Sequence, residues 1–411
     1  MLNRIWFGFF LSAALAAGGR WLLGGDPAVF AAMVDALFAM ARLSVDLTLL
    51  LFGTITLWLG LLRIAERAGL VELLGRALDP LLRRLMPEVP SGHPALGLVT
   101  LSLAANMLGL DNAATPIGLR AMRELQTLNP SREVASNAQI LFMVLHASSL
   151  SLLPVSIFMY RAQQGSHDPA LVFLPILLAT SASALTGLLS VAWMQKLRLR
   201  DPVLLAWLGG ALLLLGVIIA GLATLSAAML AATSSLVGNL LLFGIIMLFL
   251  LAGAWRRVAL YESFIDGAKE GFGVARDLLP YLVAMLCAVG VLRASGALDL
   301  MLDGVRWLMQ QLGLGGGWID ALPTALLRPF SASASRAMLI DTMRHFGVDS
   351  YPALLAATIQ GSSETTFYVL AVYFGAIGIR RVRHGLGCAL LADLAGLLAS
   401  IAVCNWFFGA R

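Results

Sequence analysis

Runs of about twenty apolar residues recur along the whole chain, and no other feature restricts its fold as strongly. A helix of that length crosses the hydrocarbon core of a bilayer. Charged residues make up only 12% of the 411 residues, about half the share found in soluble domains. The pattern leaves no water-soluble domain of useful size. It predicts an all-α polytopic membrane protein.

The hydropathy pattern predicts about nine full spans, together with four segments of other kinds. The spans are expected at residues 5–20, 47–64, 134–160, 170–195, 202–222, 230–254, 278–294, 351–378 and 384–408. Residues 95–125 and 319–345 are apolar but interrupted by polar, Gly and Pro residues, so we predict two re-entrant or broken helical hairpins. Residues 26–46 and 258–277 are amphipathic and are expected to lie in the membrane interface.

Composition argues against several classes of function. The net charge of +5 is typical of loops biased toward Lys and Arg on the cytoplasmic side, and no basic cluster with aromatics indicates nucleic acid. Cys287, Cys388, Cys404 and the five histidines are dispersed, so we predict no metal site. No HExxH, GxSxG or P-loop motif is present. We predict no enzyme, no catalytic residues and no cofactor, although one sequence leaves a Ser/His nucleophile open.

The first 19 residues resemble a signal peptide, with Arg4, an apolar run and then small residues. Because many spans follow, we favour a retained first helix. The expected location is the bacterial inner (plasma) membrane, so membrane lipid is an expected partner. Assembly into a homo-oligomer stays open.

The two halves of the chain resemble each other, which indicates an internal repeat. Five matches occur in the same order, with a spacing that shrinks in steps: Asp35 with Asp266, Asp46 with Asp277, Arg63 with Arg293, Asn106 with Arg328, and Ser148–Ser149 with Ser362–Ser363. We therefore predict a first repeat at residues 1–200, a two-span linker at 201–257 and a second repeat at 258–411.

Basic clusters predict how the repeats are oriented. They follow the last span of the first copy, precede the last span of the second copy, and close the linker: Lys196, Arg198 and Arg200; Arg380, Arg381 and Arg383; Arg256 and Arg257. If all three lie in the cytoplasm, equivalent spans run in opposite directions and the N-terminus is cytoplasmic. Inverted repeats with interrupted helices at their interface are typical of secondary transporters.

The first interrupted segment, Asn106 to Pro116, reads NMLGLDNAATP. It is rich in polar side chains, namely those of Asn106, Asp111, Asn112 and Thr115. Unwound backbone is tolerated at membrane depth where it is buried in protein or lines a wet cavity. We predict substrate-binding residues here. The alternative is an ordinary cytoplasmic turn between two short helices.

The second interrupted segment, RPFSASASR, has two arginines at its ends and serines between them. The candidate binding residues are Arg328, Ser331, Ser333, Ser335 and Arg336. Arg is suited to carboxylate or phosphate recognition. The alternative is an interfacial loop whose arginines contact lipid headgroups.

Two further predicted spans have polar residues inside them. SNAQILFMVLHASSLSLLP contributes His146, Ser148 and Ser149, and IQGSSETTFYVLAVYFGAIGI contributes a second set: Gln360, Ser362, Ser363, Glu364 and Thr365. A carboxylate in a membrane span indicates function by default, so we predict ion coupling by Glu364, with His146 as a second candidate. The alternatives are helix–helix hydrogen bonding by the hydroxyls and a structural Glu–Arg pair.

At these segments the chain resembles a fusion of the spore maturation proteins A and B. Residues 1–200 resemble the first through LWLGLLRIAERAGLVELLGRALDPLLRRLMPEVP and NMLGLDNAATPIGLRAMRELQ, and residues 225–411 the second through YESFIDGAKEGF, RPFSASASR and IQGSSETTFYVLAVYFGAIGIRRVRHGL. The shared unit is called a nucleoside-recognition or Gate domain. A related Gate protein is associated with dipicolinate passage, so the resemblance favours a small organic anion.

These features lead to one leading hypothesis and two alternatives. The leading hypothesis is a secondary transporter of a small polar solute, an organic acid or nucleoside-like molecule, working by alternating access at the repeat interface. The first alternative is a non-transporting scaffold that organises envelope proteins, with hairpins packed dry. The second is a lipid-handling protein with a lateral opening toward the bilayer.

Overall fold

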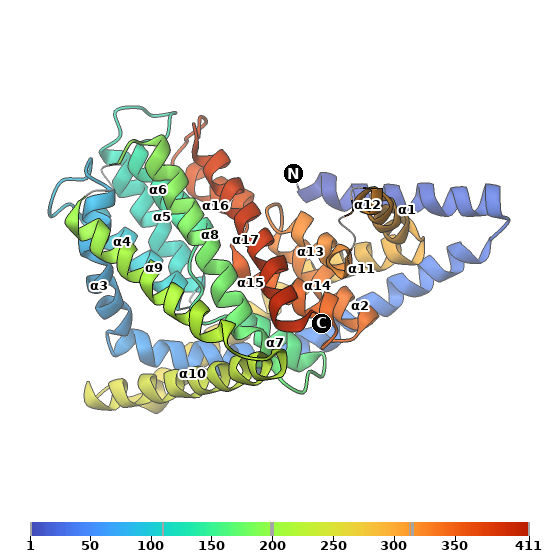
Figure 1. Cartoon of the computed structure of the whole chain (residues 1–411), viewed down its shortest axis with the longest axis horizontal. Coiled ribbons are helices and arrows are strands. Elements are labelled where there is room, and N and C mark those ends of the chain that lie inside the picture. The colour runs from blue at the N-terminus through green and yellow to red at the C-terminus, as the bar shows by residue number, and fades with distance from the viewer. Residues whose placement is uncertain (1, 109–110, 198–200, 312, 314–315, 410–411) are drawn as a thin grey trace.

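In the computed structural model the described residues are 2–108, 111–197, 201–311, 313 and 316–409, and they form an all-helical protein (Figure 1). No β-strand occurs within these ranges; the single isolated bridge joins Val134 and Arg381. The all-α prediction is therefore confirmed.

The same order of helices occurs twice. The first series contains α2 (Ala28–Arg67), α3 (Leu70–Leu85), α4 (Pro94–Met107), α5 (Asp111–Thr127), α6 (Asn137–Ala147), α7 (Val155–Gln163), η1 (Pro169–Val172) and α8 (Phe173–Met194). The second contains α11 (Leu260–Ala294), α12 (Ala297–Gln311), η2 (Gly317–Ala321), α13 (Leu322–Leu327), α14 (Ala332–Phe346), α15 (Tyr351–Ser362), α16 (Thr366–Gly375) and α17 (Gly385–Phe408). Outside the repeat lie α1 (Leu2–Gly24), α9 (Pro202–Ala223) and α10 (Ala227–Trp255).

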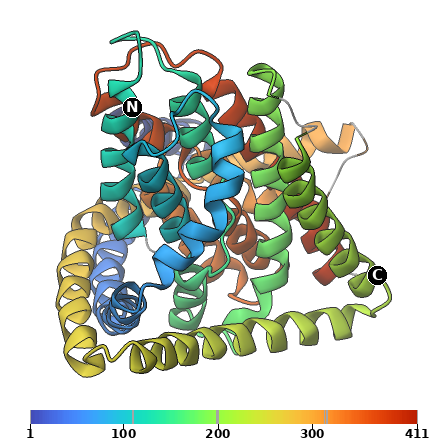
Figure 2. The ribbon, with the colours of Figure 1, turned by 90° about the vertical axis from the view of Figure 1, so that its left-hand side faces the viewer.

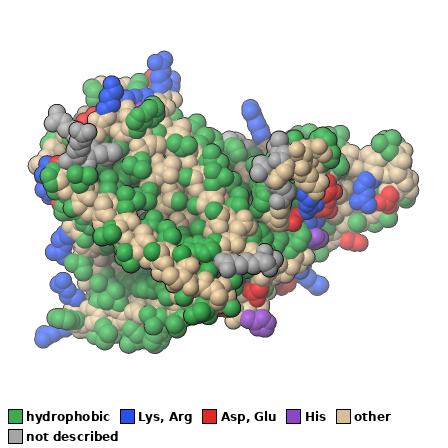
Figure 3. All heavy atoms as spheres, in the orientation of Figure 1, with side chains coloured by type: hydrophobic (Ala, Val, Ile, Leu, Met, Phe, Trp, Pro, Cys, Tyr) green, Lys and Arg blue, Asp and Glu red, His purple; other side chains and the backbone are tan. Residues whose placement is uncertain are grey.

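Within the described residues, six helices are long and apolar enough to cross a membrane, namely α1, α2, α8 with η1, α9, α10 and α17. A seventh is α11, which bends by 41° between Leu260–Val274 and Leu279–Ala294. Apolar side chains cover the face formed by α8, α9, α10 and α17, while charged side chains gather toward the edges (Figure 3). This distribution is the one expected of a protein surrounded by lipid.

Two of the nine predicted full spans are wrong, because they are broken helices. Residues 134–160 form α6 and α7, separated by a break at 148–154 that ends in Pro154. Residues 351–378 form α15 and α16, separated by a break at 363–365. Pro154 carries no N–H, and runs of Ser and Thr offer the backbone side-chain partners in place of the helical ones.

The predicted amphipathic helices are also not separate elements. Residues 26–46 continue without interruption into the next predicted span as α2, a helix of 40 residues that is about 60 Å long. Residues 258–277 continue into α11. Both pairs were divided at an aspartate, Asp46 or Asp277, but a single acidic side chain does not end a helix.

Equivalent helices of the two series pack antiparallel. Along the contact between α2 and α11, residue numbers rise on one helix as they fall on the other: Leu37 with Cys287, Phe52 with Phe272, Thr56 with Gly271, and Arg67 with Ser263. The final helices behave alike, since Gly187 of α8 packs on Ala392 of α17 while Ser183 packs on Gly396. Antiparallel pairing of equivalent helices is the geometry of an inverted repeat.

The two series exchange their sixth helices. The buried residues Val369, Tyr373 and Phe374 of α16 lie in one core with α4, α5 and α6. Ile157 to Tyr160 of α7 lie in the other core with α13, α14 and α15. We call these the first and the second lobe. In Figure 1 the helices α13, α14 and α15 of the second lobe lie between the first lobe, on the left, and the outer part of the arm formed by α1, α2, α11 and α12, on the right; in Figure 2 the first lobe faces the viewer.

Each exchanged helix is tied down at its far end. After α16, the Arg381 carbonyl accepts from the Ala135 N–H at 3.0 Å and the Arg381 N–H donates to the Glu133 carbonyl at 2.9 Å. In the last turn of α7, the fully buried Arg161 donates to Asp349 Oδ1 at 2.8 Å and to the Val348 carbonyl at 3.1 Å. Each exchanged helix is thus bound, at or just after its end, to the segment that precedes the broken span of the other series.

The close contact of α2 and α11 predicts that a methyl group at Gly271 destabilises the protein. A Cβ there would lie 2.7 Å from Thr56 Cα, so Gly271→Ala should cost about 1–3 kcal/mol through overpacking. Gly273 on the same helix has nothing within 4 Å of the added Cβ. Gly273→Ala should stabilise by up to about 1 kcal/mol through helix propensity.

Thermal unfolding of both variants in nanodiscs measures the difference. Equal melting temperatures for the two variants would contradict the antiparallel packing described here.

Candidate functional site

The two helix breaks meet at the centre of the molecule. The Glu364 N–H, in the second break, donates to the Ala147 carbonyl at the end of α6, at 2.8 Å. Each break is also bound to the tip of its own hairpin: the Leu152 N–H donates to the Met107 carbonyl at 3.1 Å, and the Phe367 N–H donates to the Pro329 carbonyl at 2.9 Å. These bonds replace helical ones where the chain unwinds.

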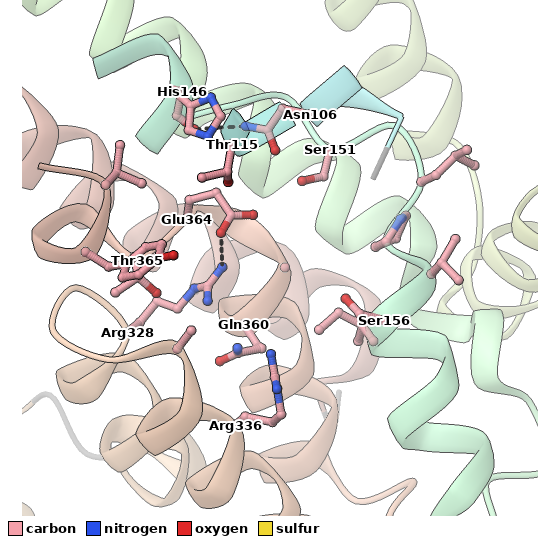
Figure 4. Close-up of a pocket in the computed structure, with 18 of the residues that line it drawn as sticks. Asn106, Thr115, His146, Ser151, Ser156, Arg328, Arg336, Gln360, Glu364 and Thr365 are labelled. Carbon is pink, nitrogen blue, oxygen red and sulfur yellow. Dashed lines mark hydrogen bonds and ion pairs between the residues drawn. The ribbon is translucent and has the colours of Figure 1, made fainter. Parts of the chain in front are cut away.

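A cavity of about 300 Å³ lies where the breaks cross (Figure 4). Its polar lining comes from both hairpins and both broken spans: Asn106, Thr115, His146, Ser151, Ser156, Arg328, Arg336, Gln360, Glu364 and Thr365. Three tyrosines complete it: Tyr160, Tyr368 and Tyr373. The cavity therefore contacts both lobes and both exchanged helices.

Among the described residues, this lining carries two arginines, Arg328 and Arg336, and one carboxylate, Glu364. Arg328, 7% exposed, lies 3.8 Å from Glu364 Oε2 and donates to the Ser363 carbonyl. Arg336 lies over the ring of Tyr160, 5.3 Å from its centroid, and its Nε is buried without a hydrogen-bond partner. No described carboxylate forms an ion pair with Arg336. An anion bound in the cavity would give the Arg336 guanidinium an acceptor of opposite charge.

The amide and hydroxyl groups of the lining are mostly held by the protein. Gln360 Oε1 accepts from Ser335 Oγ at 2.5 Å, and Asn106 Nδ2 donates to the His146 carbonyl at 3.2 Å. Thr365 is an exception, because its Oγ1 is buried without a partner among the described residues. A buried hydroxyl without a partner is costly unless something binds it. Thr365 is thus available to a ligand.

The His146 ring packs against Phe142 and Tyr373, and the Tyr373 hydroxyl lies 3.1 Å from Nε2. Gly118 of α5 allows this approach, because a Cβ at that position would clash with the Tyr373 side chain. His146 therefore forms part of a buried aromatic contact between α6 and the exchanged α16.

The sequence profile of the Gate family, described as nucleoside recognition, matches residues 48–163 and 275–380. These two segments contain both hairpins, both breaks and all the lining residues of the cavity, and they amount to more than half of the chain. The chain belongs to the Gate family.

Two curated relatives from Bacillus subtilis (strain 168) are similar to parts of this Gate protein. Spore maturation protein B is 44% identical over 161 residues, which is 39% of this chain and 89% of the relative. Spore maturation protein A is 34% identical over 155 residues, 38% of this chain and 79% of the relative. These two matches are consistent with a fused A/B protein, and this Gate protein is a multi-pass membrane protein.

The structure brings about half of the predicted site residues of this Gate protein together. The predicted residues that line the cavity are Asn106, Thr115, His146, Arg328, Arg336, Gln360, Glu364 and Thr365. Of the predicted serines, Ser331 caps α14 by accepting from the Ala334 N–H, and Ser333 pairs with Ser331. Ser335 Oγ forms hydrogen bonds with Gln360 Oε1 and with the Thr324 carbonyl, behind the residues that line the cavity.

The serine pairs point away from the cavity. Ser148 and Ser149 line an apolar groove beside α9, and Ser362 and Ser363 line a separate pocket with Asp393. Ser148 Oγ donates to the Val144 carbonyl of α6 at 2.8 Å, and the Ser149 carbonyl accepts from Thr180 Oγ1 of the neighbouring α8 at 2.8 Å. The side chains of Asp111 and Asn112 lie outside the described part of the structure.

The lining tyrosines and Ser156 were not predicted as site residues. Tyr160 and Tyr373 occupy similar positions in the two series, three residues before the end of α7 and two residues before the end of α16. That correspondence was a usable signal in the sequence. Tyrosine in an apolar run usually indicates an interface belt, so composition alone does not mark these positions.

The hydrogen-bonding states of Thr365 and Ser335 predict opposite effects on stability. Thr365→Val removes a hydroxyl that has no partner, so folding should be unchanged or stabilised by up to about 1 kcal/mol. Ser335→Ala leaves Gln360 without its donor and should cost about 1–2 kcal/mol. Thermal unfolding in detergent distinguishes them. A strongly destabilised Thr365→Val would show that this hydroxyl has a structural partner.

Proposed function

We propose that this protein is a secondary transporter of a small polar solute that carries negative charge. The observation that carries the proposal is the cavity between the lobes, which Arg336 faces without an ion-pair partner among the described carboxylates. Membership of the Gate family supports a transporter-like membrane protein. The description of that family also makes a nucleoside-like solute a substrate class to test.

Alternating access would operate at the repeat interface. Both breaks border the cavity, and both are short, so small changes in backbone angles there would reorient α7 and α16 relative to α6 and α15. We place the protein in the bacterial inner membrane with its N-terminus in the cytoplasm, because the basic clusters then all lie inside. A dry scaffold is less well supported, since the hairpins border a polar cavity.

In this proposal Arg336 binds the anionic group of the solute. Arg336→Gln should lower affinity tenfold or more, since a charge-assisted hydrogen bond contributes about 1.5–3 kcal/mol. Arg344 is exposed on the same helix and does not line the cavity, so Arg344→Gln is the matched control. Thermal-shift screening with mono-, di- and tricarboxylates and with neutral nucleosides measures binding.

Stabilisation by a carboxylate that is lost in Arg336→Gln and kept in Arg344→Gln is the expected result. If nucleosides stabilise the protein and carboxylates do not, the anionic substrate class is wrong.

Glu364 is proposed to couple transport to a proton or sodium ion, because its carboxylate lines the cavity and lies 3.8 Å from Arg328. Glu364→Gln should retain solute binding and lose concentrative uptake. Glu262, exposed at the start of α11, gives the control Glu262→Gln. Uptake into proteoliposomes with an imposed pH or sodium gradient measures coupling. Normal accumulation by Glu364→Gln would rule out this role.

A further inference from the structure

An apolar groove of about 430 Å³ lies between α9 and the first lobe. Its walls come from α3, α4, α6, α8 and α9, and no described residue in them is charged. The apolar side chains that form these walls include Leu78, Leu81, Leu82, Leu85, Leu103, Met107, Leu145, Leu177, Leu185, Leu188, Trp207, Leu208, Ala211, Leu214, Leu215 and Ile218. Ser148 and Ser149 of the first break form part of its floor. The groove thus reaches the back of the segment that borders the polar cavity.

Helix α9 bridges this groove rather than filling it. Near its start, α9 packs against α3, where Leu204 is buried; near its end, Leu222 is buried in the second lobe. Between these points its side chains are largely exposed, as Leu213 is at 70%. Both α8 and α9 are long apolar helices, so the groove lies at the depth of the acyl chains.

A polar pocket of about 450 Å³ adjoins one end of the groove and shares Leu85 with it. It is formed where α3 and α8 end and α9 begins, which is where apolar spans meet the interface. Its lining carries three basic side chains, Arg83, Arg84 and Lys196, and two acidic ones, Glu88 and Asp201.

The acidic side chains of this pocket are already bound by protein donors. Glu88 accepts from Asn137 Nδ2 at 2.7 Å, and Asp201 Oδ1 accepts from the Val203 N–H at 2.9 Å. Arg84 reaches Asp201 only at 3.5 Å, and Lys196 forms no ion pair with a described carboxylate. The pocket therefore has basic capacity left for an anionic group.

We propose that this pocket and groove bind one anionic phospholipid. The phosphate lies between Arg84 and Lys196, and an acyl chain follows α9 toward Ser148 and Ser149. A basic pocket at the interface, continuous with an apolar groove between helices, matches a lipid with an anionic head and an apolar tail. The site is separate from the polar cavity, and the proposal does not depend on solute transport.

The equivalent position in the second series has a different character. Its equivalent pocket, beside Ser362 and Ser363, measures about 240 Å³ and contains Asp393, whose Oδ1 is buried without a partner. A carboxylate disfavours an acyl chain, and no described helix corresponds to α9 there. The proposed lipid thus packs behind the first break only, and the second break is packed by protein side chains instead.

Native mass spectrometry of the full chain in detergent tests this site, with dioleoyl phosphatidylglycerol and dioleoyl phosphatidylcholine supplied at equal concentration. The wild type should retain one phosphatidylglycerol with a several-fold preference. Arg84→Gln combined with Lys196→Gln should abolish the preference, while Arg84→Lys keeps it. Arg76→Gln, on the exposed side of α3, is the control.

The groove is tested by filling it. Ala211→Trp places a ring where the acyl chain would lie and should remove the retained lipid, whereas Leu213→Trp, outside the groove on the same helix, should not. Equal retention of the two lipids by the wild type would overturn the proposal, as would retention by Ala211→Trp. If phosphatidylcholine alone is retained, the basic pocket does not select the head group.

Discussion

The fold depends on satisfying backbone groups where two helices are broken inside the membrane. An unpaired N–H or C=O costs several kcal/mol in hydrocarbon, on the order of the whole stability of a small domain. The hairpin tips at Met107 and Pro329 accept from the broken spans, and the breaks bind each other through Glu364 and Ala147. The hairpins, the helix breaks and the contact between the two breaks therefore stabilise one another. The cavity lies at the crossing because only there do the backbone and the polar side chains meet.

The two series of helices match in their backbone arrangement and differ in the side chains that they contribute to the cavity. The two hairpin contacts correspond residue by residue, and the paired helices α2 with α11 and α8 with α17 run antiparallel. The second hairpin nevertheless contributes both arginines of the cavity, while the first contributes Asn106 and Thr115. In the proposed transporter, a symmetric frame would allow equivalent movements on both sides, and an asymmetric lining would give a bound solute a defined orientation.

Much of this arrangement could be predicted from the sequence, and the failures have physical causes. Long apolar runs identified seven of the helices, and the polar segments at Asn106 and Arg328 identified both hairpins. Hydropathy averages over a window, so it did not resolve the breaks at 148–154 and 363–365. Hydropathy also does not report which side of a helix a residue faces. For this reason Ser148–Ser149 and Ser362–Ser363 were predicted to line the cavity, although they face away from it. The exchange of α7 and α16 depends on long-range packing that no local pattern encodes.

That exchange has a consequence for the order in which the chain folds during synthesis. The core around α4, α5 and α6 needs Val369, Tyr373 and Phe374, which are made more than two hundred residues later. Helix α7 must wait in the same way for α14 and α15, and its buried Arg161 has no Asp349 until then. Neither lobe can close before nearly the whole chain has been inserted, and contacts so distant in sequence form slowly. The unfinished protein must therefore keep polar break segments in the bilayer without their final partners, so it is most vulnerable in the membrane before synthesis ends.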